Sequence, residues 1–272
     1  MIFIAMFSLT LNLLLLFLPP ILCQPIEETV LLKSVVISNH SGPLNEHSLG
    51  TYFDRVGDLK IKNSNISDLS KGTLKLLSQL QNLTISDSSI QKTEDDVFSS
   101  CCPTLRVLRV TNWKDMEEED LRGIGTLPLE TLSIDHQNLT QLGEDIFRNT
   151  NLKCLSLDHN NIKYLSNAVF DDLYQLEELS ISWNDLDELP RDVLAPLKRL
   201  KTLKLETDRF SKFSWVNLTY LPELTEIYLT KKQMVEVNLW GIQEKAPKLK
   251  DVYLVGNDGI VTDENEGPTI HF

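Results

Sequence analysis

The clearest pattern in the chain is an alternation of apolar and polar residues that returns every 24 residues. The order L-x-x-L-x-L-x-x-N-x-[IL]-x-x-L begins at Leu152 and again at Leu176, and its first part recurs at Leu200. Within each unit, the L-x-L segment places two apolar side chains on one face of a short strand and the residue between them on the other face. Each unit therefore predicts one short strand followed by a return segment.

The return segment opens with a position that is often asparagine, as at Asn160 and Asn184. A buried asparagine amide can bond backbone groups of its own turn and of the next one, which would otherwise lack partners. Apolar residues such as Ile162 and Phe170 then bring the chain back with their side chains pointing inward. One unit cannot bury its own apolar face, so the pattern predicts that the units stack into a solenoid.

The leading apolar residue can be followed through nearly the whole chain. It falls at Leu32, Val56, Leu80, Leu105, Leu129, Leu152, Leu176, Leu200, Leu224 and Leu249. We therefore expect one repeat domain at 24–257, with about ten units of which the first is degenerate. The segment 258–272 is expected to be a C-terminal tail, too short and polar to form a further repeat. Trp113 and Lys232 occupy the asparagine position in two units and cannot bond the turn in the same way, which predicts local distortion there.

These motifs resemble those of extracellular leucine-rich repeat proteins of the 24-residue type, over residues 32 to about 257. The resemblance is greatest to short secreted members from animals, including insect immune proteins. It implies an α/β fold, a curved horseshoe solenoid with a parallel β-sheet on the concave face and irregular or short helical segments on the convex side. It also implies recognition of a protein or microbial ligand, with innate immunity as the leading context.

The chain departs from many of these relatives in lacking the cysteine clusters that cap both ends of the array. Exposed core ends would then be covered by the tails, by a partner or by self-association.

The first 22 residues are almost entirely apolar and carry no charge, and Pro19-Pro20 ends any helix there. They predict a signal peptide at 1–23, cleaved near Cys23, and hence a secreted, extracellular protein. No Lys or Arg precedes the apolar core, and about 20 apolar residues can span a bilayer. The alternative is therefore a cell-surface adhesion or receptor ectodomain held by an uncleaved anchor. No later segment is apolar enough to cross a membrane, so the mature chain is expected to have no membrane span.

The net charge of −13 bears on which classes of partner the chain can bind. A strongly acidic chain argues against binding nucleic acid or docking on anionic lipid. The sequence contains no Gly-rich phosphate loop, no G-x-S-x-G elbow and no H-E-x-x-H motif. We therefore expect a non-catalytic protein without a cofactor.

Three cysteines remain after such a cleavage. Cys102 and Cys154 lie two units apart, which is roughly 10 Å along the stack, whereas bridged Cα atoms lie within about 7 Å. A disulfide between them is therefore disfavoured. We expect Cys154 to face outward between Thr131 and Glu178, where it is either a quiet thiol or the site of an intermolecular disulfide with a partner.

Sequons of the N-x-[ST] type, together with the expected signal peptide, predict N-glycosylation. They occur at Asn39, Asn65, Asn82, Asn138 and Asn217. Asn82 falls on the outward side of a strand. A glycan there would cover the N-terminal part of the inner curve and shift ligand binding toward later repeats.

The outward residues of each strand are expected to line the concave face and to form a surface, because each comes from a different unit. An exposed Trp with Tyr neighbours is typical of a binding hot spot, although Trp183 packing only against its neighbours is the plainer interpretation. The residues expected to bind the ligand are Asp135, His136, Asp158, His159, Trp183, Lys204, Glu206, Tyr228 and Tyr253.

The pairs Asp135–His136 and Asp158–His159 occupy equivalent places on adjacent units. Stacking would bring the four side chains within several ångströms of one another. Two imidazoles and two carboxylates could bind a divalent metal, or could make ligand binding depend on pH. The plainer interpretation is two solvated Asp–His pairs, so no metal is assigned.

Overall fold

The computed structural model describes residues 32–45, 49, 53–91, 97–99, 101–114, 116–207, 209, 220–234, 244–255 and 269–271. The chain divides into two compact units, Met1–Leu31 and Leu32–Phe272, and the described residues all belong to the second. The predicted signal peptide and the sequon at Asn217 lie outside the described residues.

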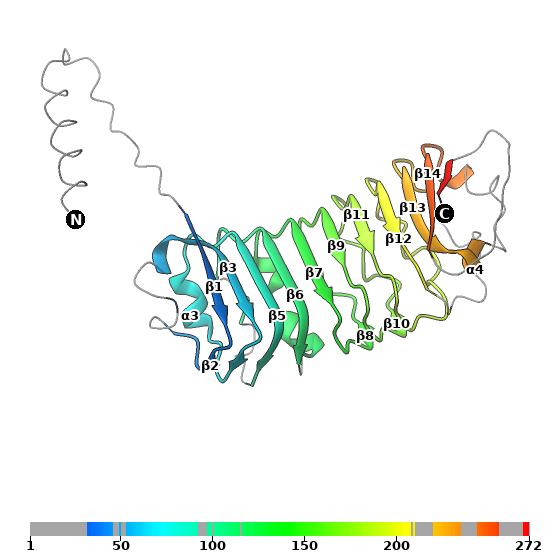
Figure 1. Cartoon of the computed structure of the whole chain (residues 1–272). Coiled ribbons are helices and arrows are strands. Elements are labelled where there is room, and N and C mark those ends of the chain that lie inside the picture. The colour runs from blue at the N-terminus through cyan, green and yellow to red at the C-terminus, as the bar shows by residue number, and fades with distance from the viewer. Residues whose placement is uncertain are drawn as a thin grey trace, which may run out of the picture. The chain divides into compact units, whose positions relative to one another are not determined.

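The second unit is built on one parallel sheet whose strands follow each other in chain order (Figure 1). The order is β1-β3-β5-β6-β7-β9-β11-β12-β13-β14-β15. The strands are β1 (Lys33–Ser38), β3 (Val56–Lys62), β5 (Asn82–Ile90), β6 (Val107–Lys114), β7 (Thr131–Asp135), β9 (Cys154–Ser156), β11 (Glu178–Ser180), β12 (Thr202–Lys204), β13 (Glu226–Thr230), β14 (Asp251–Val255) and β15 (Thr269–His271). Each strand with the segment that returns to the next one is called a rung below.

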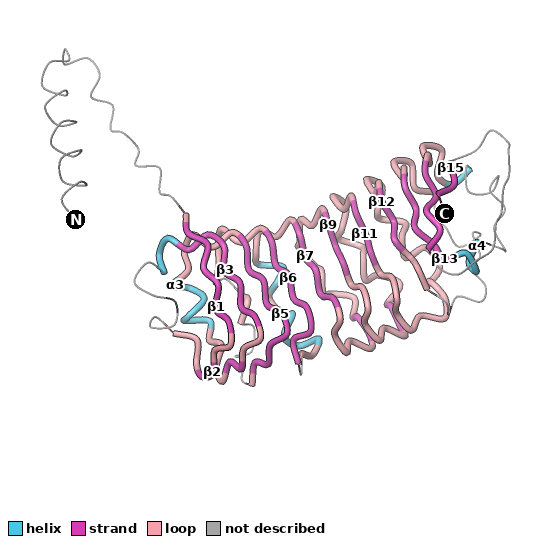
Figure 2. Tube along the Cα trace, in the orientation of Figure 1, coloured by secondary structure: helices cyan, strands magenta, loops and turns pink. Residues whose placement is uncertain are grey.

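Short elements complete the return segments, which are mostly loops in the described residues (Figure 2). Strand β4 pairs with β2 and β5, and β8 pairs with β10 in a separate two-stranded sheet. These strands are β2 (Ser41–Gly42), β4 (Asn65–Ile66), β8 (Gln141–Leu142) and β10 (Tyr164–Leu165); the helices are α3 (Lys71–Leu76), α4 (Lys231–Met234) and the 3₁₀ helices η2 (Phe53–Arg55), η3 (Glu118–Leu121) and η4 (Ile124–Thr126). Among the described residues, no helix has the length and apolar character needed to cross a bilayer.

The register of the sheet follows the repeat. Leu155 pairs with Leu132 on one side and with Leu179 on the other. Cys154 lies between Thr131 and Glu178, as the alignment of the units predicted. The predicted leucine-rich-repeat solenoid is therefore confirmed.

The core is a continuous stack of buried leucines, isoleucines, valines and phenylalanines. Leu152, Leu176 and Leu200, the leading residues of the three clearest units, are all fully buried. Burying one such side chain contributes about 1.5–3 kcal/mol relative to leaving it exposed. Phe147 and Phe170 stack on each other in the return segments, with ring centroids 6.3 Å apart.

Asparagine ends the strand in two middle rungs. Asn160 Nδ2 donates to the carbonyls of Ile134 (2.7 Å) and Leu157 (2.9 Å), and its Oδ1 accepts from the Gln137 backbone N–H (3.1 Å). One rung later, Asn184 Nδ2 donates in the same way to the carbonyls of Leu157 and Ile181, and its Oδ1 accepts from the Ile162 backbone N–H. These bonds satisfy backbone groups at the point where the chain leaves the sheet, as predicted.

Serine occupies the same position in earlier rungs. Ser88 Oγ donates to the Ser86 carbonyl (2.8 Å) and accepts from the Ser64 backbone N–H (3.2 Å). Ser64 repeats these contacts toward Lys62 and His40. A hydroxyl thus provides part of the bonding that an amide provides.

The two expected distortions have different outcomes. Trp113 Nε1 is buried without a hydrogen-bond partner, so this side chain does not bond the turn. Near Lys232, the adjacent Gln233 takes the asparagine role, because its Nε2 donates to the Leu205 carbonyl (2.9 Å) and its Oε1 accepts from the Thr230 N–H (2.6 Å). The alignment therefore placed this position one residue too early, at the start of α4.

The sheet continues into the segment that was expected to be a tail. Strand β15 pairs in parallel with β14, with Ile270 opposite Val252. Ile270 packs against the core, so it covers part of the apolar surface at that end.

Candidate functional site

The most regular feature beside the core is a column of residues with positive φ, one at the equivalent repeat position of seven successive rungs and close to the end of each strand. These residues, called here the left-handed column, are Asn39 (φ 54°), Asn63 (47°), Asp87 (49°), Asn112 (52°), His136 (55°), His159 (54°) and Trp183 (57°). Asn, Asp and His enter this backbone region more readily than other residues with a side chain, and a bulky residue there is an outlier. The sequence change from Asn to Trp along the column therefore carries a conformational cost.

The last three members of the left-handed column stack on one another. The rings of His136 and His159 are 4.3 Å apart between centroids and nearly parallel, at 8°. The rings of His159 and Trp183 follow at 6.1 Å and 13°. Trp183 is 38% exposed. The structure thus brings these predicted residues together into one exposed aromatic stack.

A second stack lies on the strands near the C-terminal end. Tyr228 and Tyr253 are 4.4 Å apart between ring centroids, and Tyr253 and His271 are 4.5 Å apart. Lys204 Nζ lies 5.4 Å from the Tyr228 ring centroid, within the range of a cation–π contact. His271, which also pairs with Asp251 at 2.8 Å, was missed by sequence reasoning. Nothing in the sequence indicated this contact, because the repeat pattern does not extend to β15.

Lys204 is tied to its own sheet by Glu178, 2.8 Å away. Partial burial opposes a charge on Lys204, but the hydrogen bond and the charge of Glu178 outweigh it and raise the pKa of the ammonium. Burial and the charge of Glu226 raise the pKa of Tyr228. Both groups therefore keep their protons at neutral pH, as a cation and as a neutral phenol.

The predicted acidic residues have internal roles. Asp135 Oδ1 accepts from Ser156 Oγ (2.7 Å) and from the Asp158 backbone N–H (2.9 Å). Asp158 Oδ1 accepts from the Ser182 N–H (2.7 Å) and from Ser180 Oγ (2.7 Å). These carboxylates hold neighbouring rungs together where the strands end.

Glu206 differs from the expectation for it. It was predicted to face a ligand, but it is only 9% exposed and its carboxylate accepts a hydrogen bond from Ser182 Oγ. The Ser182 hydroxyl also accepts from the Glu206 backbone N–H (3.2 Å), so Glu206 is held against the preceding rung by two hydrogen bonds. Among the described residues, no cluster of three or more His, Cys, Asp or Glu is arranged to hold a metal ion.

Asp158 is the carboxylate most affected by its surroundings. Burial raises its pKa, the hydrogen bonds from Ser180 and Ser182 oppose that change, and the charges of Asp135 and Glu206 add to it. The free energy of unfolding should therefore depend on pH through this group.

The four described sequons are unevenly placed. Asn39, Asn65 and Asn138 are exposed, and Asn82 is half-buried. Asn39 and Asn65 line a cavity of about 630 Å³ beside the early rungs. All four precede β9 in the chain, whereas Trp183 and the tyrosine stack follow it.

Cys154 is half-buried and lies in strand β9. Burial and the nearby charge of Glu178 raise the pKa of its thiol. Because the thiolate is the reactive form, this environment lowers its reactivity toward a partner disulfide.

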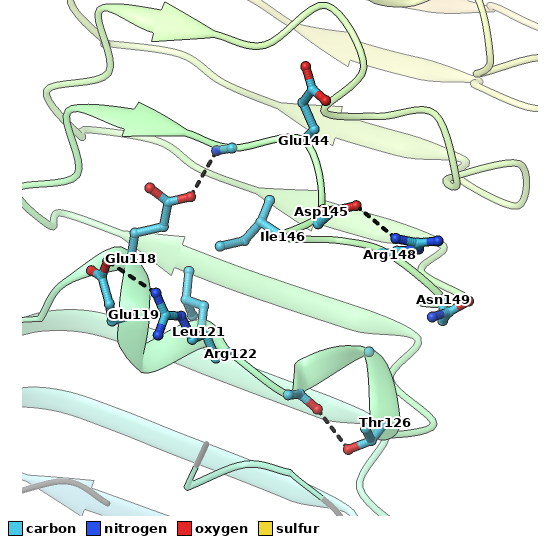
Figure 3. A pocket seen from close by; sticks show the side chains of 13 residues that line it. Glu118, Glu119, Leu121, Arg122, Thr126, Glu144, Asp145, Ile146, Arg148 and Asn149 are labelled. Carbon is cyan, nitrogen blue, oxygen red and sulfur yellow. Dashed lines mark hydrogen bonds and ion pairs between the residues drawn. The ribbon is translucent and has the colours of Figure 1, made fainter. Parts of the chain in front are cut away.

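A cavity of about 580 Å³ lies between the 3₁₀ helices η3 and η4 and the turn at 143–149 (Figure 3). Arg122 pairs with Glu119 at 3.6 Å, and Arg148 with Asp145 at 3.3 Å. Glu118 Oε1 accepts from the Gly143 N–H at 2.8 Å. The charged side chains that line this cavity are thus largely paired with each other or with the backbone. None of the predicted site residues lines it.

The comparisons with known proteins agree with this architecture. A family model described as "Leucine rich repeat" matches residues 128–186, and one described as "BspA type Leucine rich repeat region (6 copies)" matches residues 29–119. No curated protein matches the chain.

Among solved structures, the crystal structure of a TLR13–ssRNA13 complex is similar, with a TM-score of 0.57 and 17% sequence identity. The match covers 81% of this chain but 39% of the other, so this chain spans about two fifths of that protein's length. At this identity the similarity concerns the fold alone. Two family models of the same repeat, the 23- to 25-residue register of the sheet and the asparagine-bonded turns lead to one conclusion: the chain belongs to the leucine-rich repeat proteins.

Proposed function

We propose that this chain is a secreted, non-catalytic recognition protein that binds a protein or microbial ligand through the outward residues of its later rungs, in the context of innate immunity. The observation that carries the proposal is Trp183. It is exposed, it stacks on His159, and it adopts a backbone conformation that disfavours its own side chain.

Backbone strain of this kind costs about 1–3 kcal/mol per residue and is concentrated at functional sites. Asn63 and Asn112 occupy the same column at less cost. The core does not require a Trp at this position, because the side chain lies outside it. A ligand contact supplies a reason for retaining it, since Trp and Tyr are the commonest hot-spot residues of protein interfaces.

The placement of the sequons supports the later rungs as the binding region. Glycans on Asn39, Asn65 and Asn138 would project from the early half of the array. Glycans on the four described sequons would leave the tyrosine stack and Trp183 uncovered, since all four precede β9; the fifth sequon, Asn217, lies outside the described residues.

The class of ligand follows from charge. The similar TLR13 structure was solved with single-stranded RNA. This chain carries a net charge of −13, and binding a polyanion requires cationic groups that displace counterions. We therefore propose a protein or neutral microbial surface component, contacted by aromatic rings, by Lys204 and by His271.

The test uses the full glycosylated chain from culture medium, captured against microbial surfaces and extracellular proteins with and without reductant. For any ligand found, Trp183→Ala and Tyr228→Ala should each weaken binding at least about 10-fold without unfolding the protein. Tyr164→Ala is the matched control, because Tyr164 is an aromatic residue that is 73% exposed and lies in β10, outside the main sheet. Normal binding by both variants would show that this face is not the site.

Secretion is tested separately by locating the full chain. Recovery from conditioned medium with a new N-terminus near residue 23 supports the proposal. Retention in the membrane fraction with residues 1–22 still attached would instead favour a receptor or adhesion ectodomain held by an N-terminal anchor.

A further inference from the structure

Two neighbouring cysteines lie in the turn that leads into β6. Cys101 is 2% exposed and Cys102 is fully buried, and neither forms a disulfide in the structure. Their sulfur atoms are 2.8 Å apart. Cys101 Sγ lies 3.5 Å from the Phe98 carbonyl oxygen, and Cys102 Sγ lies 3.8 Å from the Leu74 carbonyl oxygen in α3 of the preceding rung.

The distance between the two sulfurs is unusually short. Carbon atoms in contact lie about 3.5–4.0 Å apart, and sulfur is larger than carbon. A disulfide bond is about 2.05 Å long. The turn therefore holds the two sulfurs closer than two atoms in ordinary contact lie, at a distance between contact and a covalent bond.

We propose that Cys101 and Cys102 form a disulfide with each other when the chain folds in an oxidising compartment. The oxidant is an external disulfide, either glutathione disulfide or that of an oxidoreductase. One cysteine thiolate attacks the external disulfide, forms a mixed disulfide and releases one thiolate. The second cysteine thiolate then attacks the mixed disulfide and releases the other. The two cysteines lose two protons and two electrons, and the external disulfide is reduced to two thiols.

The order of events follows from burial. A thiol reacts as its thiolate, and in the folded chain the hydrogen bond from Cys101 and burial both raise the pKa of Cys102. An external disulfide also has no access to either sulfur once the turn is packed. The bond therefore forms before the turn docks on α3, and it is protected from reductant afterwards.

The consequence for the array is local. A disulfide stabilises mainly by closing a loop, and a loop of two residues has little chain entropy to lose. Adjacent Cα atoms are about 3.8 Å apart, which is shorter than the usual separation in disulfides. The small ring instead fixes the turn that positions Leu105 and β6, and it leaves Cys154 as the free thiol of the described residues.

Peptide mapping tests this directly, because trypsin releases residues 93–106 as one peptide that contains both cysteines and no other. The full chain is unfolded in denaturant with excess N-ethylmaleimide and then digested. We expect this peptide to carry no maleimide and to be lighter than the dithiol peptide by two hydrogen atoms. After reduction it should take up two maleimides.

The chain is prepared in two ways, from culture medium and by refolding with reduced and oxidised glutathione, so the result does not depend on secretion or on ligand binding. In Cys154→Ser the peptide should be unchanged, whereas in Cys101→Ser it should carry one maleimide on Cys102. Two maleimides on the unreduced wild-type peptide in both preparations would overturn the proposal. So would a peptide bridged to Cys154 or to another chain.

Discussion

The early and late rungs share one spacing but differ in how each strand ends. Strands β3, β5 and β6 have seven, nine and eight residues, whereas β9, β11 and β12 have three each. In the early rungs, the pairing of β5 with β6 continues past the asparagine position, with Ser88 opposite Trp113. In the late rungs, Asn160 and Asn184 bond the carbonyls of Leu157 and Ile181, each directly after the end of its strand. One side chain per rung therefore correlates with the length of the strand.

The same two regions differ in the left-handed column. The early members are Asn and Asp, which fit the backbone and leave a polar edge, and Asn112 Nδ2 donates to Asp87 Oδ1 at 2.9 Å. The late members are His, His and Trp, whose rings stack, and of these Trp fits the backbone conformation poorly. In the early half, the residues of the left-handed column suit their backbone conformation. In the late half, Trp183, which we assign to ligand binding, does not.

The largest effect should be common to both regions. Leu83→Ala and Leu155→Ala each remove a side chain that is at most 1% exposed, so each should lower the free energy of unfolding by about 2–5 kcal/mol. Urea unfolding followed by circular dichroism measures this. A shared core predicts a single transition in both variants, whereas loss of only half of the signal would show that the two regions unfold separately.

The next effect should separate the regions. Asn160→Ala removes the side-chain partner of the Ile134 carbonyl and of the Gln137 N–H, whereas the Leu157 carbonyl still accepts from Asn184 Nδ2. Each unpaired buried group costs about 1–3 kcal/mol. We expect a loss of about 3 kcal/mol. Ser88→Ala removes two bonds, one of them an acceptor for the Ser64 N–H, and should cost about 1–2 kcal/mol. Equal losses in urea unfolding would contradict the view that the amide contributes more than the hydroxyl.

Much of this fold could be predicted from the sequence because the repeat spacing determines which side chains lie next to each other. The 24-residue period fixes which residues share a face, and from it follow the position of Cys154 between Thr131 and Glu178 and the role of Asn160. Sequence spacing also placed His136 beside His159. Contacts between equivalent positions on adjacent rungs are set by the repeat alone.

Contacts that depend on conformation or lie outside the repeat were not predictable in this way. The positive φ of Trp183 was not predicted, because Trp itself rarely adopts this conformation; the signal lies in the Asn and Asp residues at the equivalent positions of earlier rungs. Gln233 replaces the expected Lys232 because the chain turns into α4 there. The contact of His271 with Tyr253 needs a strand that follows no leucine pattern.

A smaller effect is the dependence of the free energy of unfolding on pH through Asp158. The folded-state pKa of Asp158 is raised, first by burial, so the folded chain holds its proton more tightly than the unfolded chain. The contribution of this group to stability is therefore greatest below its unfolded pKa of about 3.9 and falls as pH rises through the raised value. Asp158→Asn removes that fall. The free energy of unfolding of the variant, measured across acid pH, should therefore increase relative to that of the wild type as pH rises.

The control for this experiment is Asp187→Asn, since Asp187 is an exposed carboxylate of the same region. It should leave the pH profile of unfolding unchanged. A wild-type profile that Asp158→Asn does not alter would mean that solvent reaches this carboxylate more freely than its burial implies.

The smallest expected change in stability tests the left-handed column itself. Trp183→Asn relieves strain of about 1–3 kcal/mol and loses one aromatic stack of about 0.5–1.5 kcal/mol. We expect the free energy of unfolding to rise by about 1 kcal/mol while ligand binding is lost. The reciprocal variant, Asn63→Trp, places the same ring in the early half, where it should lower stability and leave binding unchanged. Both are measured by thermal unfolding beside the binding assay. If Trp183→Asn instead lost stability, Trp183 would be retained for its packing on His159, and the early and late halves would differ in structure alone.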